Sequence, residues 1–163
     1  MGFWEKVLPG YKGYKGREEG RNTDKLLREH LASKLRESRA HFDDYKVDLT
    51  RRGNLGLMNP AEKVTQTLGR LIDRLRYANY GFSGRWMGQK IDVEELNQVY
   101  EFDKQLATRV EEIDKSIRAL DMIEDDGETT SALKSLAHLI REVDEALNER
   151  EQILRTFGGE AVE

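Results

Sequence analysis

The most regular feature of the chain is the recurrence of apolar residues at steps of three and four, the spacing that places side chains on one face of an α-helix. Three long stretches with this pattern contain no glycine. A fourth contains only Gly69, which costs about 1 kcal/mol relative to alanine inside a helix. The pattern predicts four helices, over residues 23–52, 59–80, 92–124 and 129–157.

Polar residues at the start of each stretch predict where the helices begin. Asn22 or Thr23 is a suitable cap for the first helix, and Asn59, followed by Pro60, is a suitable cap for the second. Asp92 with Glu95 three residues later forms the capping-box pattern of the third helix. The fourth helix is expected to begin at Thr129 or Thr130 and to end before Gly158.

The last two predicted helices form a hairpin whose register can be read from the sequence. Their apolar positions step by three and four, as in a coiled-coil seam. If the chain folds back at Asp126-Gly127, each seam residue faces one whose number completes a sum of 253, and Ile113 then faces Ile140. The seam positions are Leu96, Val99, Asp103, Leu106, Val110, Ile113, Ile117 and Leu120, and Leu133, Leu136, Ile140, Val143, Leu147, Arg150, Leu154 and Phe157.

Each helix of the hairpin has one polar residue in its seam. The same sum places Asp103 opposite Arg150. A single charge in an apolar seam costs several kcal/mol, whereas two that meet can satisfy each other and fix the register. We therefore predict a structural ion pair between Asp103 and Arg150, the alternative being that both side chains lean outward at a frayed end.

Together these patterns predict an all-α fold: an elongated four-helix bundle with coiled-coil character, in which the third and fourth helices form an antiparallel hairpin. The domain organisation expected is a flexible basic and aromatic N-terminal arm over 1–21, a helical bundle over 22–158 and a disordered tail over 159–163. The 163 residues, 36% of them charged, suit helices with one apolar face.

Charge is unevenly divided along the chain. Residues 1–91 carry a net charge of +8 and residues 92–163 a net charge of -12. One interpretation is a basic face for an anionic partner. The other, which we favour, is that the two halves pack side by side and compensate each other.

The N-terminal arm combines aromatic, basic and glycine residues. Phe3-Trp4 with Val7 and Leu8 could form a short interfacial anchor, or these side chains could cover one end of the bundle. Glycine at every third position from Gly10 to Gly16 disfavours a helix. The candidate residues for binding a partner or an anion in this arm are Phe3, Trp4, Tyr11, Lys12, Tyr14 and Lys15.

A second basic and aromatic segment spans residues 70–90. Cations with interleaved aromatic rings are typical of single-strand nucleic-acid sites, of lipid-headgroup sites and of protein interfaces. The aromatic rings could equally plug the bundle between the second and third helices. The candidate binding residues are Arg70, Arg74, Tyr77, Tyr80, Phe82, Arg85, Trp86 and Lys90.

No catalytic motif is recognisable. The chain has no cysteine, and none of its three histidines follows an acidic residue by three positions, as a di-iron bundle site requires. Gly81-Phe82-Ser83-Gly84-Arg85 lacks the final glycine of a nucleophile elbow. The sequence therefore predicts a protein without its own active site, without a metal or cofactor, and with no small-molecule substrate.

The function expected from these features is that of a non-enzymatic scaffold or adaptor. It would bind a protein partner, another copy of itself or an anionic membrane surface through the N-terminal arm and the 77–90 loop. The alternatives are a nucleic-acid-associated protein that uses the basic half, and a subunit of an enzyme complex. The absence of a secretory signal or an apolar span favours a cytoplasmic location, at the membrane periphery if a membrane is the partner.

Overall fold

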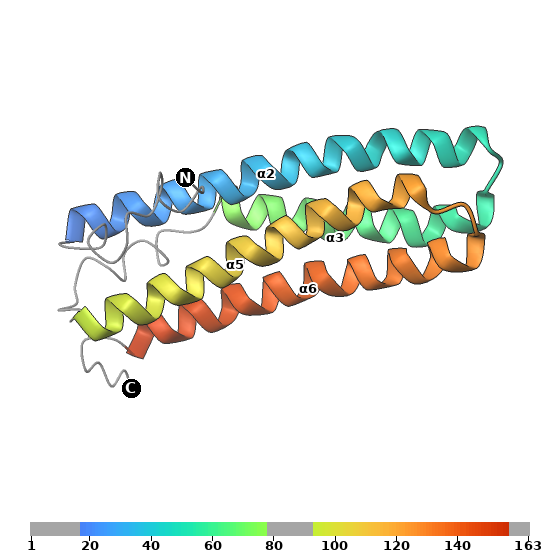
Figure 1. Ribbon diagram of the computed structural model, residues 1–163. Helices are drawn as coiled ribbons and strands as arrows, with labels where there is room; N and C mark the ends of the chain where they lie inside the picture. Colours follow the sequence, from blue (N-terminus) through green and yellow to red (C-terminus); the bar gives the residue numbers. More distant parts are fainter. Residues whose placement is uncertain (1–16, 78–92, 157–163) are drawn as a thin grey trace.

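The fold is all-α, as predicted, and is built from four long helices (Figure 1). The structure is a computed structural model that describes residues 17–77 and 93–156, within which there is no β-strand. The helices are α2 (Arg17–Arg51), α3 (Met58–Arg76), α5 (Val93–Ala119) and α6 (Asp126–Thr156). Two short 3-10 helices, η2 (Leu55–Leu57) and η3 (Leu120–Met122), lie in the two turns.

The helices form two antiparallel hairpins packed side by side. α2 pairs with α3 and α5 with α6, while α2 also lies along α5 and α3 along α6. Because the hairpins point the same way, α3 and α6 run parallel to each other, as do α2 and α5 (Figure 1). Both turns lie at one end of the bundle, which we call the turn end. At the other end, which we call the open end, lie Arg17, Val93 and Thr156, whereas α3 stops short of it, with Leu75 beside Arg28 (Figure 1).

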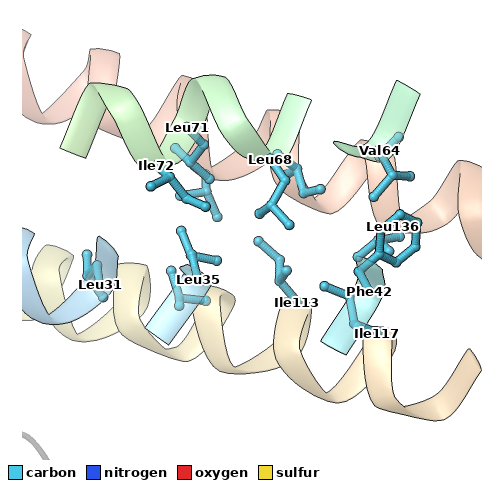
Figure 2. Close-up of a cluster of buried hydrophobic side chains, with 14 of the residues drawn as sticks. Leu31, Leu35, Phe42, Val64, Leu68, Leu71, Ile72, Ile113, Ile117 and Leu136 are labelled. Atoms are coloured by element: carbon cyan, nitrogen blue, oxygen red, sulfur yellow. The ribbon is translucent and has the colours of Figure 1, made fainter. Parts of the chain in front are cut away.

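The predicted apolar stripes form the core. Every seam residue of α5 and α6 whose side chain is described is buried, as is the stripe of α2 from Leu27 to Leu49, with Ser38 in its gap. Figure 2 shows where the four stripes meet, with Leu35 and Phe42 from α2 among side chains of the other three helices. The side chains of Leu96 and Phe157 lie outside the described residues.

The predicted ion pair between Asp103 and Arg150 is present. Arg150 Nε donates to Asp103 Oδ1 at 2.6 Å and Arg150 Nη2 donates to Asp103 Oδ2 at 3.1 Å. Both residues are almost completely buried, with 0% of Asp103 and 1% of Arg150 exposed. The two-pronged contact places the hairpin in the register that the sum of 253 predicts, so the alternative of two outward-leaning charges is wrong.

The first helix begins earlier than predicted. α2 starts at Arg17, so Gly20 lies inside the helix and neither Asn22 nor Thr23 is its cap. Residues 17–21, assigned to the flexible arm, are helical. The good helix formers Arg17, Glu18 and Glu19 outweigh the cost of about 1 kcal/mol that one glycine adds. The rest of the predicted arm, like the predicted tail over 159–163, lies outside the described residues.

The other helix ends were predicted to within a few residues. η2 leads directly into α3, which starts at Met58 with Leu57 rather than Asn59 at the cap position. α5 gives way to η3 at Leu120, short of the predicted end at Glu124. α6 starts at Asp126, three residues before Thr129. Asp125 is the residue that caps it, because its Oδ2 accepts a hydrogen bond from the backbone N–H of Glu128 at 2.9 Å.

The buried ion pair yields a first prediction. Asp103→Leu leaves the Arg150 guanidinium without its carboxylate in an apolar seam, which should lower the free energy of unfolding by about 3–5 kcal/mol. Asp103→Leu combined with Arg150→Leu should recover most of this loss, since a hydrophobic replacement of a buried pair is often neutral or stabilising. Urea unfolding of the two single variants and the double variant measures the coupling. Losses that simply add would contradict it.

Gly69 supplies a second prediction. A methyl group at position 69 would lie 3.5 Å from Nη1 of Arg39, an ordinary van der Waals distance. Gly69→Ala should therefore raise the free energy of unfolding by about 0.5–1 kcal/mol, through helix propensity alone. Gly53→Ala is the control and should lower the free energy of unfolding, because Gly53 has a φ of 74°, where a side chain is strained. Chemical unfolding of both variants decides the matter, and a loss of stability in Gly69→Ala would show that the helices cannot accept the methyl group.

Candidate functional site

Only three of the predicted binding residues fall in the part of the chain that the structure describes. Arg70 and Arg74 lie on α3, and Tyr77 directly follows this helix. Tyr77 is 68% exposed, and the Arg76 guanidinium lies over its ring at 5.0 Å from the centroid. The candidates outside the described residues are Phe3, Trp4, Tyr11, Lys12, Tyr14, Lys15, Tyr80, Phe82, Arg85, Trp86 and Lys90. The choice between a binding loop and a core plug falls on the same undescribed segment.

Arg74 is used to join α3 to α6. Its Nη1 donates to Asp144 Oδ1 at 2.8 Å and to the Asp144 backbone oxygen at 3.0 Å. Its Nη2 donates to Asn148 Oδ1 at 2.7 Å and lies 3.6 Å from Glu151 Oε2. With both arms of the guanidinium engaged by acceptors of the same chain, Arg74 holds two parallel helices together. The binding role expected for Arg74 from the sequence stays a prediction, and these contacts show a structural role for the same side chain.

An ion pair and a hydrogen bond of a histidine also cross from the basic half of the chain to the acidic half. Lys34 Nζ lies 3.6 Å from Asp114 Oδ2, and His41 Nε2 lies 2.6 Å from Asp121 Oδ2. With the Arg74 contacts, these pairs tie α2 and α3 to the opposite hairpin. The halves pack side by side and compensate each other, in agreement with the interpretation favoured from the sequence.

A polar network fills the gap in the apolar stripe of α2. Ser38 Oγ donates to the buried carboxylate of Asp114 at 2.6 Å, and Arg118 Nε donates to its other oxygen at 3.0 Å. Burial alone would raise the pKa of Asp114. The hydrogen bonds from Ser38 and Arg118, with the positive charges of Lys34 and Arg118, outweigh burial and lower the pKa of that carboxyl below its ordinary value. The charged carboxylate of Asp114 therefore joins α5 to α2 through Ser38 and Lys34.

A groove with a volume of about 600 Å³ lies between α3 and α6. Arg70 is one of three cations along it, with Lys63 from α3 and Arg141 from α6. Glu62 and Asp144 also lie in its lining, and Leu71 and Ile140 form its floor. Glu62 Oε2 is 3.3 Å from Lys46 Nζ, and Asp144 is held by Arg74. The acidic groups of the groove are thus already paired with cations, whereas its own three cations make no ion pair with the described residues.

A second hollow lies at the turn end. It has a volume of about 460 Å³ and includes His41, Tyr45, Arg51 and Asp121. The pKa of the Tyr45 hydroxyl is raised because burial disfavours the charged phenolate. Among residues 25–77 and 94–156, no group of three or more histidine or acidic side chains is placed to hold a metal ion. None of the described helices is long and apolar enough to cross a membrane.

Comparisons with protein-family models, with curated proteins and with solved structures gave no match for this chain.

Lys63 and Arg141 are the groove residues that the sequence analysis missed. Lys63 and Arg70 are seven residues apart and so share a helix face, which the sequence reveals. Arg141 joins them only because α3 and α6 are parallel neighbours, and no local pattern encodes that arrangement. The partnership of Ser38 with Asp114 was missed for the same reason, because the two residues are 76 positions apart.

Asp114 yields a prediction about acid stability. Because its pKa is lower in the folded state, the ionised carboxylate stabilises the fold above about pH 4, the ordinary aspartate range, and this stabilisation is lost as the pH falls through the folded-state pKa. Asp114→Asn should be less stable than the parent at pH 7, and the difference should shrink below pH 4. Urea unfolding at both pH values measures it.

Glu112→Gln, which changes an exposed carboxylate of the same helix, is the matched control and should show little difference at either pH. A gap between Asp114→Asn and the parent that stays constant from pH 7 to acid would contradict the role assigned to the charge.

Proposed function

We propose that the protein is a non-enzymatic helical scaffold that binds an anionic membrane surface through the open end of its bundle. The observation that carries this proposal is where the helices end. Arg17 and Val93 lie at the open end and α3 runs toward that end, so the basic and aromatic segments 1–16 and 78–92 are attached on this side of the bundle (Figure 1). Two segments that are far apart in the sequence can therefore act on the same surface.

The chemistry of those two segments suits an anionic interface. Together they contain Trp4 and Trp86, with Phe3, Phe82 and several tyrosines, and their net charge is positive. Indole rings favour the boundary between water and lipid, and lysine and arginine are attracted to acidic headgroups. Neither segment contains an apolar run of the length that spans a bilayer, which fits peripheral binding.

The sides of the bundle offer less to a large anionic partner. Several cations of α2 and α3 are already paired with carboxylates, among them Lys34 with Asp114 and Arg74 with Asp144. This compensation weakens the case for nucleic acid along the basic half, which stays an alternative. A protein partner at the same end would use the same residues, and the experiment below separates it from a membrane.

The test is sedimentation of the full chain with vesicles. Binding to vesicles that contain phosphatidylglycerol is expected, with little binding to vesicles of phosphatidylcholine alone. Trp4→Ala combined with Trp86→Ala should weaken binding by about tenfold or more, because burying a large apolar side chain contributes about 1.5–3 kcal/mol. The melting temperature should stay near that of the parent if these rings are at the surface.

The matched control is Leu55→Ala combined with Met122→Ala. These two residues are 72% and 84% exposed and lie in the two connections at the turn end. The control should bind vesicles as the parent does. Equal losses in both double variants, or no preference for the anionic vesicles, would contradict the proposal. A protein captured by the open end without any vesicle binding would identify the partner as a protein.

A further inference from the structure

The groove between α3 and α6 has an excess of uncompensated positive charge. Lys63, Arg70 and Arg141 line it, and none of the three makes an ion pair or a hydrogen bond with another described side chain. Elsewhere on the same pair of helices, the cation Arg74 is held by acceptors from three residues, Asp144, Asn148 and Glu151. The contrast matters because unpaired cations that converge on a hollow attract counter-ions and anionic ligands.

The two carboxylates in the lining do not cancel this charge. Asp144 Oδ1 accepts a hydrogen bond from Arg74 at 2.8 Å, so its charge is offset by a residue that does not line the groove. Glu62 is offset in the same way by Lys46 of α2, which donates to its Oε2 at 3.3 Å. Cations around the groove neutralise its acids, and the three cations within it are left for a ligand.

The positions of the cations suit a ligand with more than one anionic group. Lys63 and Arg70 are two turns apart on one face of α3, about 10 Å along the axis at 1.5 Å per residue. Gln66, whose side-chain amide can donate hydrogen bonds, lies between them, and Arg141 lines the groove from the α6 side. Guanidinium groups bind phosphate oxygens through paired donors, so two arginines and a lysine can hold neighbouring phosphates.

The other lining residues are poorly suited to two classes of anionic ligand, lipids and nucleic acids. Leu71 and Ile140 are only 1% and 0% exposed, so these two side chains offer little apolar surface to an acyl chain. Among the described residues no aromatic side chain lines the groove, so these residues offer a nucleobase no ring to stack on. The volume of about 600 Å³ is that of a small-molecule site.

We infer that this groove binds a soluble ligand that carries two or more phosphate groups, held by Lys63, Arg70 and Arg141. The site is on the side of the bundle and does not rest on the function proposed for the open end. Binding would also link α3 to α6 next to the Arg74 contacts, so the ligand should stabilise the fold as well as occupy the groove.

The experiment is calorimetric titration of the full chain with sodium tripolyphosphate in buffer of low ionic strength. One site per chain with a micromolar dissociation constant is expected, with an affinity that falls as salt is added. The triple variant Lys63→Gln, Arg70→Gln, Arg141→Gln should bind at least about tenfold more weakly, since each cation contributes charge-assisted hydrogen bonds. Its melting temperature without ligand reports whether it is folded.

The matched control is Arg36→Gln, Lys115→Gln, Lys134→Gln. It removes the same charge from exposed positions that make no ion pair with the described residues. The control should bind tripolyphosphate as the parent does. Equal weakening in both triple variants would assign the binding to net charge and overturn the site, as would the absence of binding to the parent. If the groove variant lost binding only to phosphatidylglycerol vesicles, the ligand would be a lipid headgroup and the inference of a soluble ligand would be wrong.

Discussion

Arg150 and Asp103 meet inside the apolar seam between α5 and α6, and the register of that hairpin depends on their contact. A slip of one helical turn would still bury leucine against isoleucine, but it would leave two charges unpaired at a cost of several kcal/mol. Burial of the apolar seam thus stabilises the hairpin of α5 and α6, and the ion pair selects one alignment of the two helices. With the hairpin in that alignment, Asp114 on α5 and Asp144 on α6 stand at the heights where α2 and α3 supply their partners.

The contacts between the two hairpins follow from this alignment. α5 meets α2 through Ser38 and Asp114, and α6 meets α3 through Arg74 and Asp144. Lys34 of α2 compensates the charge of Asp114, and Arg74 of α3 compensates that of Asp144. The opposite net charges of the two halves of the chain therefore suit a packing that joins a basic hairpin to an acidic one. Lys63, Arg70 and Arg141 are the cations of the groove, and none of them makes an ion pair with another described residue.

The fold could be predicted from the sequence because the spacing of apolar residues in each helix shows which face is buried. The seam of α5 and α6 depends only on periodicity, and every predicted seam residue whose side chain is described is buried. Helix ends were less predictable, because several neighbouring residues could begin or cap each helix equally well. α2 begins at Arg17 and Asp125 caps α6, although nearby residues have similar helix propensity or capping strength. The site was the least predictable part. Arg74 looks like an anion-binding residue until the neighbour of α3 is known, and that neighbour is set by tertiary packing.

The arrangement of the hairpins also separates the two proposed sites. α3 and α5 occupy opposite corners, so the connection from Tyr77 to Val93 joins diagonal helices. The same diagonal connection makes α3 and α6 parallel neighbours, which brings Arg141 to the face that holds Lys63 and Arg70. The diagonal connection from α3 to α5 therefore has two consequences. It attaches an aromatic segment to the ends of these helices, and it brings the three cations of the groove together on the side of the bundle. Substitutions in the groove leave the open end unchanged, and each site can be tested while the other is intact.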